Sequence, residues 1–150
     1  MRRPTRGLWL ALLVLLHLGC GDEGPNDELT YGELEGTWVL LSLIYTSDAN
    51  PATTFDFRAA SGSGSLRFEA DTSFLLILLP DPGSPTESAT GPIALEGSTI
   101  VLTDNADPDL PLLSGTLIGQ RLVFETEDAE YDFDGDGADE PARVDVVFER

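Results

Sequence analysis

The sequence has 150 residues, a formal net charge of −19 and a single cysteine. So acidic a surface repels nucleic acid and anionic lipid headgroups, so we expect no nucleic acid partner. One cysteine cannot form an internal disulfide, and the only histidine, His17, lies in the apolar N-terminal segment. The remaining chain therefore lacks the groups for Cys–His or Ser–His catalysis and for a zinc site of His and Cys ligands.

The N-terminus has the three-part organisation of a secretory signal. A basic segment over residues 1–6 precedes the unbroken apolar run 8–16, and the small residue Gly19 stands before Cys20. The apolar run is shorter than the ~20 residues that a transmembrane helix needs. We expect export to remove residues 1–19, which carry three arginines and no acidic residue, and this changes the net charge from −19 to −22.

The stretch Leu18-Gly19-Cys20 resembles a bacterial lipobox. In that family a signal peptidase cuts before the cysteine, so the resemblance implies a covalent lipid on Cys20 and anchoring to a membrane of the bacterial cell envelope. His17 departs from the family pattern, in which leucine is usual, and an ordinary secreted protein is the alternative. Gly21 stands where an inner-membrane retention signal has aspartate, which favours the outer membrane.

After the anchor we expect a polar tether over residues 20–32 and one folded domain over residues 33–150. Residues 27–34 are expected to form a short helix or turn, with Asn26 or Asp27 as its N-cap. From Gly36 on, β-branched and aromatic runs alternate with clusters of Gly, Pro, Asp and Ser, which indicates an all-β domain. We expect strands near residues 37–46, 54–58, 64–69, 73–79, 92–96, 98–103, 113–118, 121–126, 129–134 and 142–149.

Short connections between these strands predict a meander, hence an up-and-down antiparallel β-barrel of about eight strands, with a sandwich as the alternative. Residues 47–53, 80–88 and 105–111 are candidate loops at a barrel mouth. Proline is expected outside strand interiors, with Pro92 at the first position of its strand.

Two of the expected strands are apolar on both faces, whereas a barrel wall alternates. For residues 37–46 the pattern does not reveal which set of side chains lines the interior. For residues 74–79 we expect a loop to cover the outer face, with the N-terminal segment, a second subunit and the membrane as other candidates.

The stretch Gly36-Thr37-Trp38 resembles the Gly-x-Trp motif of lipocalins and lipocalin-like domains, which begins the first strand after a short helix. A Gly-x-Leu-x-Phe strand over residues 64–68 and the segment 115–122 resemble later features of that family. The resemblance implies a contact at the barrel base, in which Arg150 packs over Trp38. It also implies a cavity for a small apolar ligand, although a filled core is equally compatible with eight strands.

The stretch from Asp132 to Glu140 resembles Asp-x-Asp-x-Asp-Gly calcium loops. Alternate carboxylates on a tightly turned chain converge on one point, and hard oxygen ligands suit Ca²⁺. An EF-hand loop would place Arg143 where a bidentate glutamate is needed, whereas the shorter loops found between strands fit better. The expected ligands are Asp132, Asp134, Asp136, the Ala138 carbonyl and Glu140. The alternative is a solvated hairpin in which Asp and Gly serve only as turn formers.

These patterns lead to two hypotheses for a monomeric protein without enzymatic activity. In the first, a membrane-anchored barrel binds a small apolar molecule. In the second, a calcium-stabilised β-module with a filled core contacts a protein or glycan. An open apolar cavity would favour the first hypothesis, and a filled barrel with an ordered acidic loop the second.

Overall fold

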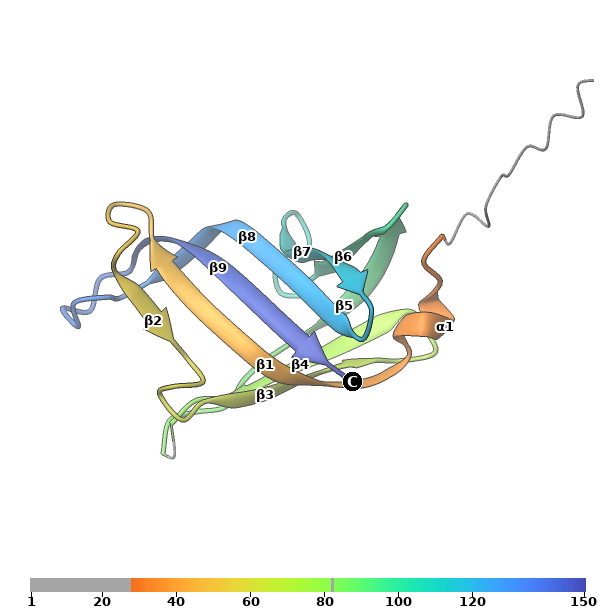
Figure 1. Ribbon diagram of the computed structural model, residues 1–150, viewed down its shortest axis with the longest axis horizontal. Coiled ribbons are helices and arrows are strands. Elements are labelled where there is room, and N and C mark those ends of the chain that lie inside the picture. Colours follow the sequence, from red (N-terminus) through yellow and green to blue (C-terminus); the bar gives the residue numbers. More distant parts are fainter. Residues whose placement is uncertain (1–27, 82) are drawn as a thin grey trace, which may run out of the picture.

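The computed structural model describes residues 28–81 and 83–150 (Figure 1). The expected signal peptide, the lipid on Cys20 and the expected caps Asn26 and Asp27 lie outside these residues. The described chain has one short helix, α1 (Tyr31–Leu34), and is otherwise all-β. Its strands are β1 (Gly36–Ser47), β2 (Thr54–Asp56), β3 (Ser63–Phe68), β4 (Ser73–Leu79), β5 (Glu87–Glu96), β6 (Thr99–Thr103), β7 (Pro111–Ile118), β8 (Arg121–Tyr131) and β9 (Glu140–Glu149).

Eight of the nine strands form a closed antiparallel barrel, which confirms the predicted fold class. Strands β3 to β9 are neighbours in chain order, and β1 closes the barrel by pairing with both β3 and β9. The extra strand β2 pairs with residues 44–46 of β1. Closure gives each barrel strand a neighbour on both sides over part of its length, and β8 continues beyond its pairing with β7, which ends at Glu125.

The barrel has two different ends (Figure 1). Helix α1 and the C-terminus lie at one end, which we call the base, and the β1–β2 and β8–β9 connections lie at the other, the mouth. Because strands alternate in direction, the long connections after β4 and β6 also lie at the mouth, as the sequence predicted. Within the described part of the chain, no helix has the length and apolar character needed to span a bilayer.

Strand β1 is apolar on both faces because it changes face midway. Its pairing with β9 shifts register between Leu40 and Ser42, which leaves Leu41 as an extra residue. Before this bulge Trp38 and Leu40 face the core, and after it Leu43 does. A bulge of one residue inverts the inside–outside alternation, so both sets of side chains contribute to the interior.

The expectation that Pro92 begins its strand is wrong, because β5 starts at Glu87 and Pro92 lies within it. Residues 87–92 pair with β4, whereas residues 93–96 pair with β6. Ile93 N–H donates to Thr72 O on the β4 side (3.0 Å), so the nitrogen of Pro92 faces the other side, beyond the end of the β6 ladder. Gly91 allows this crossing, since a Cβ there would lie 1.8 Å from Thr103 O.

Two further boundaries differ from those expected. The N-cap of α1 is Thr30, whose amide and hydroxyl both donate to the Glu33 carboxylate (2.8 Å each). These two hydrogen bonds lower the pKa of Glu33. The strands expected at residues 121–126 and 129–134 are one strand, β8, because a bulge between Thr126 and Ala129 carries the pairing with β9 past the polar interruption.

The base is sealed by contacts between the two ends of the described chain. Trp38 is buried, and its Nε1 donates to Leu34 O (2.8 Å). The Arg150 guanidinium lies 4.5 Å from the centre of the Trp38 ring and donates to three carbonyls, those of Glu33 (3.2 Å), Leu34 (3.1 Å) and Glu35 (2.6 Å). Arg150 thus donates to carbonyls that a helix C-terminus leaves without partners. Its positive charge also interacts favourably with the negative end of the helix dipole.

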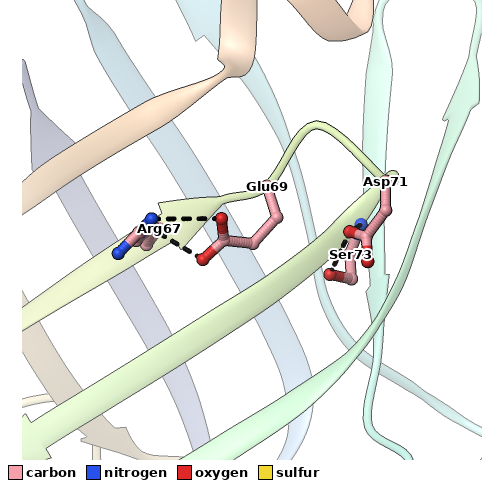
Figure 2. A network of polar contacts seen from close by, with 4 residues as sticks. All are labelled: Arg67, Glu69, Asp71 and Ser73. Carbon is pink, nitrogen blue, oxygen red and sulfur yellow. Dashed lines mark hydrogen bonds and ion pairs between the residues drawn. The ribbon is translucent and has the colours of Figure 1, made fainter.

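The β3–β4 hairpin at the base is held by polar side chains (Figure 2). Arg67 pairs with Glu69 (2.9 Å), and the Asp71 carboxylate accepts hydrogen bonds from the Ser73 hydroxyl (2.5 Å) and amide (3.2 Å). The hydroxyl contact lowers the pKa of Asp71. Beyond this turn, β4 buries Phe74 and Leu76, whereas the outward Leu79 is 45% exposed, so no described loop fully covers the outer face.

We predict that Arg150→Ala lowers the free energy of unfolding by about 2 kcal/mol, because it removes a cation–π contact and leaves the α1 carbonyls to solvent. The free energy of unfolding of Arg150→Lys should lie between those of the native protein and Arg150→Ala, since lysine keeps the positive charge but lacks the planar guanidinium. The measurement is urea denaturation followed by tryptophan fluorescence. The matched control is Arg143→Ala, which breaks an exposed pair with Asp145 and should cost under about 0.5 kcal/mol. Equal losses for Arg150→Ala and Arg143→Ala would contradict the prediction.

Candidate functional site: an apolar cavity with an acidic mouth

A cavity of about 420 Å³ occupies the mouth half of the barrel. This volume lies within the range of about 300–1,000 Å³ that is typical of small-molecule sites. Its walls come from residues of five strands, β1, β4, β7, β8 and β9, and from the β6–β7 connection. The apolar lining residues are Leu43, Leu76, Leu78, Leu110, Leu112, Leu113, Ala129, Val144, Val146 and Phe148.

The base half of the barrel is filled instead. Its interior is packed with large, fully buried side chains, among them Phe74, Phe124 and Ile100. Phe124 packs edge-on against Phe148, with ring centroids 6.2 Å apart, and Phe148 also lines the cavity. Phe148 is therefore part of the cavity floor. The barrel forms a cup that is open at the mouth and closed below by the packed side chains of the base half.

Five carboxylate residues line the cavity where it opens to solvent, and we call them the mouth carboxylates: Asp104, Asp107, Glu125, Asp128 and Glu130. Four of the five are exposed, and Asp104 is half-buried. The lining contains no arginine, lysine or histidine. Low-dielectric walls concentrate the field of such charges, so the mouth has a negative potential.

The bulge in β8 gives Asp128 its place at the mouth. Thr126 pairs with Val144, and Ala129 pairs with Ala142, so β8 carries one residue more than β9 across this interval. Bulges are common beside functional sites because they re-aim side chains. The sequence showed that acidic residues crowd along this strand, but it did not place any of them on a cavity.

An aromatic cluster adjoins the cavity and was missed in the sequence. Tyr45, which lines the cavity, has its ring 4.8 Å from that of Tyr131, and Phe55 of β2 stacks on Tyr131 at 4.6 Å. Burial raises the pKa of the Tyr45 hydroxyl, and the nearby charge of Glu87 raises it further. The cluster continues to Phe133, 5.0 Å from Tyr131, at the start of the β8–β9 loop.

The acidic β8–β9 loop brings four of the predicted metal ligands together. Carboxylate oxygens of Asp132, Asp134, Asp136 and Glu140 all lie within 4.8 Å of one another. Loop amides orient these carboxylates: Asp132 accepts from Gly135 (2.6 Å) and Gly137 (2.9 Å), and Glu140 accepts from Phe133 (2.8 Å). Gly137 has a φ of 89°, a conformation that a side chain would strain.

The geometry of this loop fits a calcium ion. Ca²⁺–oxygen distances of about 2.4 Å place opposite ligands about 4.8 Å apart, so the four oxygens fit one coordination sphere. The Ala138 amide donates to Asp136 (2.8 Å), and the Ala138 carbonyl as a fifth ligand stays a prediction. The same hydrogen bonds also suit a loop whose aspartates act only as turn formers.

The remaining predicted site residues are separate from both features. Trp38 and Arg150 lie at the base, and neither lines the cavity. Cys20 precedes the described residues. No protein-family model and no curated protein matches this sequence.

We predict that Asp132 protonates below the ordinary aspartate pKa of about 3.9, because the Gly137 amide, with smaller contributions from other loop amides, stabilises its charged form. A carboxylate whose pKa is lower in the folded than in the unfolded protein stabilises the folded state at pH values above its ordinary pKa. This stabilisation is lost as the pH falls through the pKa of the folded state. In an NMR titration followed at the Asp132 carboxyl carbon, the midpoint should therefore lie below this ordinary value. A midpoint at or above 3.9 would show that these hydrogen bonds are absent in solution.

Proposed function

We propose that this protein is an exported, lipid-anchored bacterial lipoprotein whose lipocalin-like barrel binds a small apolar ligand. The observation that carries the proposal is the cavity of about 420 Å³ with apolar walls, a packed floor and an open mouth. A cup of this form can remove the apolar part of a ligand from water, at about 25 cal/mol for each Å² buried.

The arrangement of the barrel suits an anchor at Cys20. Seven residues separate Cys20 from Glu28, the first described residue, which leads directly into α1 at the base. A short tether at the base leaves the mouth at the opposite end of the barrel. A lipid on Cys20 would thus hold the base toward the membrane and leave the cavity open to the surrounding compartment.

The second candidate function is a calcium-stabilised interaction module. It is favoured by the four carboxylates that converge in the β8–β9 loop. In the part of the chain that the structure describes, the three ion pairs are Arg67–Glu69, Arg121–Glu149 and Arg143–Asp145, and none involves these carboxylates. A bound cation would relieve the repulsion between them and make the hairpin rigid enough to present to a protein or glycan.

Native mass spectrometry of the protein from membranes of its own host tests the first proposal. We expect the spectrum to contain a complex with a co-purified small molecule. The same spectrum should give the mass of residues 20–150 plus acyl groups. Ala129→Trp, which inserts an indole into the cavity, should abolish the complex and leave the acyl groups in place, so the chain mass changes only by the substitution itself.

The matched control is Ala94→Trp, which adds the same volume at an exposed position of β5. It should retain the co-purified molecule. Loss of the molecule from both variants, or a chain that never carries one, would contradict the ligand-binding proposal. An unmodified chain mass would contradict the lipid anchor alone.

For the second candidate, we predict that millimolar Ca²⁺ raises the melting temperature, because a ligand that binds only the folded state stabilises it. Extracellular calcium modules have dissociation constants of about 10⁻⁴–10⁻³ M, so the midpoint of a calcium titration should lie in this range. Asp136→Asn keeps the hydrogen-bond acceptor for Ala138 but removes the charge, and it should abolish the shift. Asp109→Asn, outside the carboxylate cluster, should preserve it. An unchanged melting temperature in the native protein would rule out calcium binding.

A further inference from the structure

The cavity combines two properties that restrict the charge of its ligand. Its depth is apolar, with walls from Leu43, Leu113 and Val146. Its opening carries the five mouth carboxylates and no basic residue. An apolar carboxylic acid could bury its chain in this cavity only by placing its own negative charge among these five, which electrostatic repulsion disfavours.

In the described residues, none of the ion pairs joins an arginine to a mouth carboxylate. Arg143, which lies in β9 opposite the β8 bulge that contains Asp128, is half-exposed and pairs with Asp145 (3.6 Å). Arg58 donates to Gly62 O (2.8 Å), and Arg150 is at the base. A positive group on the ligand is therefore the natural counter-charge for the mouth carboxylates.

The aromatic cluster adds a second, independent reason for a cation. Tyr45 is the member of the cluster that lines the cavity, and its ring packs against those of Tyr131 (4.8 Å) and Phe55 (6.3 Å). The face of an aromatic ring attracts ammonium groups, and Tyr45 presents such a ring to the cavity. Aromatic and carboxylate side chains thus meet at the same end of the cavity, where the head group of an inserted ligand would lie.

We propose that the ligand of this cavity is an apolar cation, an amine or quaternary ammonium compound with an aromatic or aliphatic body. The apolar body fills the mouth half of the barrel, and the positive group lies between Tyr45 and the mouth carboxylates. This inference rests on the proposed ligand-binding function and specifies the class of compound that the cavity selects.

The test compares three probes with the same benzyl body: benzyltrimethylammonium, benzyl alcohol and phenylacetate. The full chain, as its host processes it, is held in lipid nanodiscs, and empty nanodiscs serve as the blank. Binding is followed by NMR shifts of methyl groups on Leu43 and Leu113 in the cavity wall. We expect the cation to bind at least about tenfold more tightly than the alcohol, and phenylacetate more weakly than either.

A charge-neutralised variant separates the mouth from the general acidity of the protein. Asp107→Asn, Asp128→Asn and Glu130→Gln together should remove most of the preference for the cation and leave benzyl alcohol binding unchanged. The control removes three exposed carboxylates outside the cavity lining, by Glu28→Gln, Glu35→Gln and Glu96→Gln, and should retain the preference.

Each outcome decides one of the two proposals. If benzyl alcohol and phenylacetate bind as tightly as the cation, the cavity is a ligand site and the inference about charge is wrong. If the control variant loses the preference as fully as the mouth variant, overall charge and not the mouth is responsible, which also overturns the inference. If no probe shifts the cavity methyl groups, the ligand-binding function fails together with it.

Discussion

The barrel depends on a contact that joins the two ends of the described chain. Arg150, its last residue, covers Trp38 and donates to carbonyls at the end of α1, more than a hundred residues earlier in sequence. The adjoining strands β1 and β9 pair over most of their length, so this contact also fixes the seam that closes the barrel. In the described residues the base is sealed by these contacts, so the cavity toward the mouth is closed below and is not a channel.

The two halves of the interior serve different purposes. Near the base, large side chains such as Phe74, Phe124 and Leu122 fill the barrel and supply the packed core that a domain of this size requires. Toward the mouth, smaller side chains such as Val144 and Ala129 leave space. Packing is therefore concentrated at one end, and the other end keeps a cavity, exposed carboxylates and a turn that uses Gly137.

The strands and most of their connections were predictable because period-two alternation and turn residues are local signals. The failures occurred where a strand departs from regular pairing. Leu41 is a bulge that exchanges the faces of β1, Pro92 lies where β5 changes partner, and the bulge after Thr126 joins two expected strands into β8. None of these leaves a local signal, because a bulge is imposed by the neighbouring strands.

The sequence by itself determined the all-β class, the acidic character of the chain and the loop in which Asp132, Asp134 and Asp136 converge, since alternate residues on a tight turn are close in any fold. It also carries the signal-like N-terminus that ends at Cys20. Only the tertiary structure decided that the barrel is hollow toward its mouth and that carboxylates from the β6–β7 connection and from β8 line one opening around Tyr45. Closure of the sheet places these residues together, and closure depends on pairings between strands that are distant in sequence.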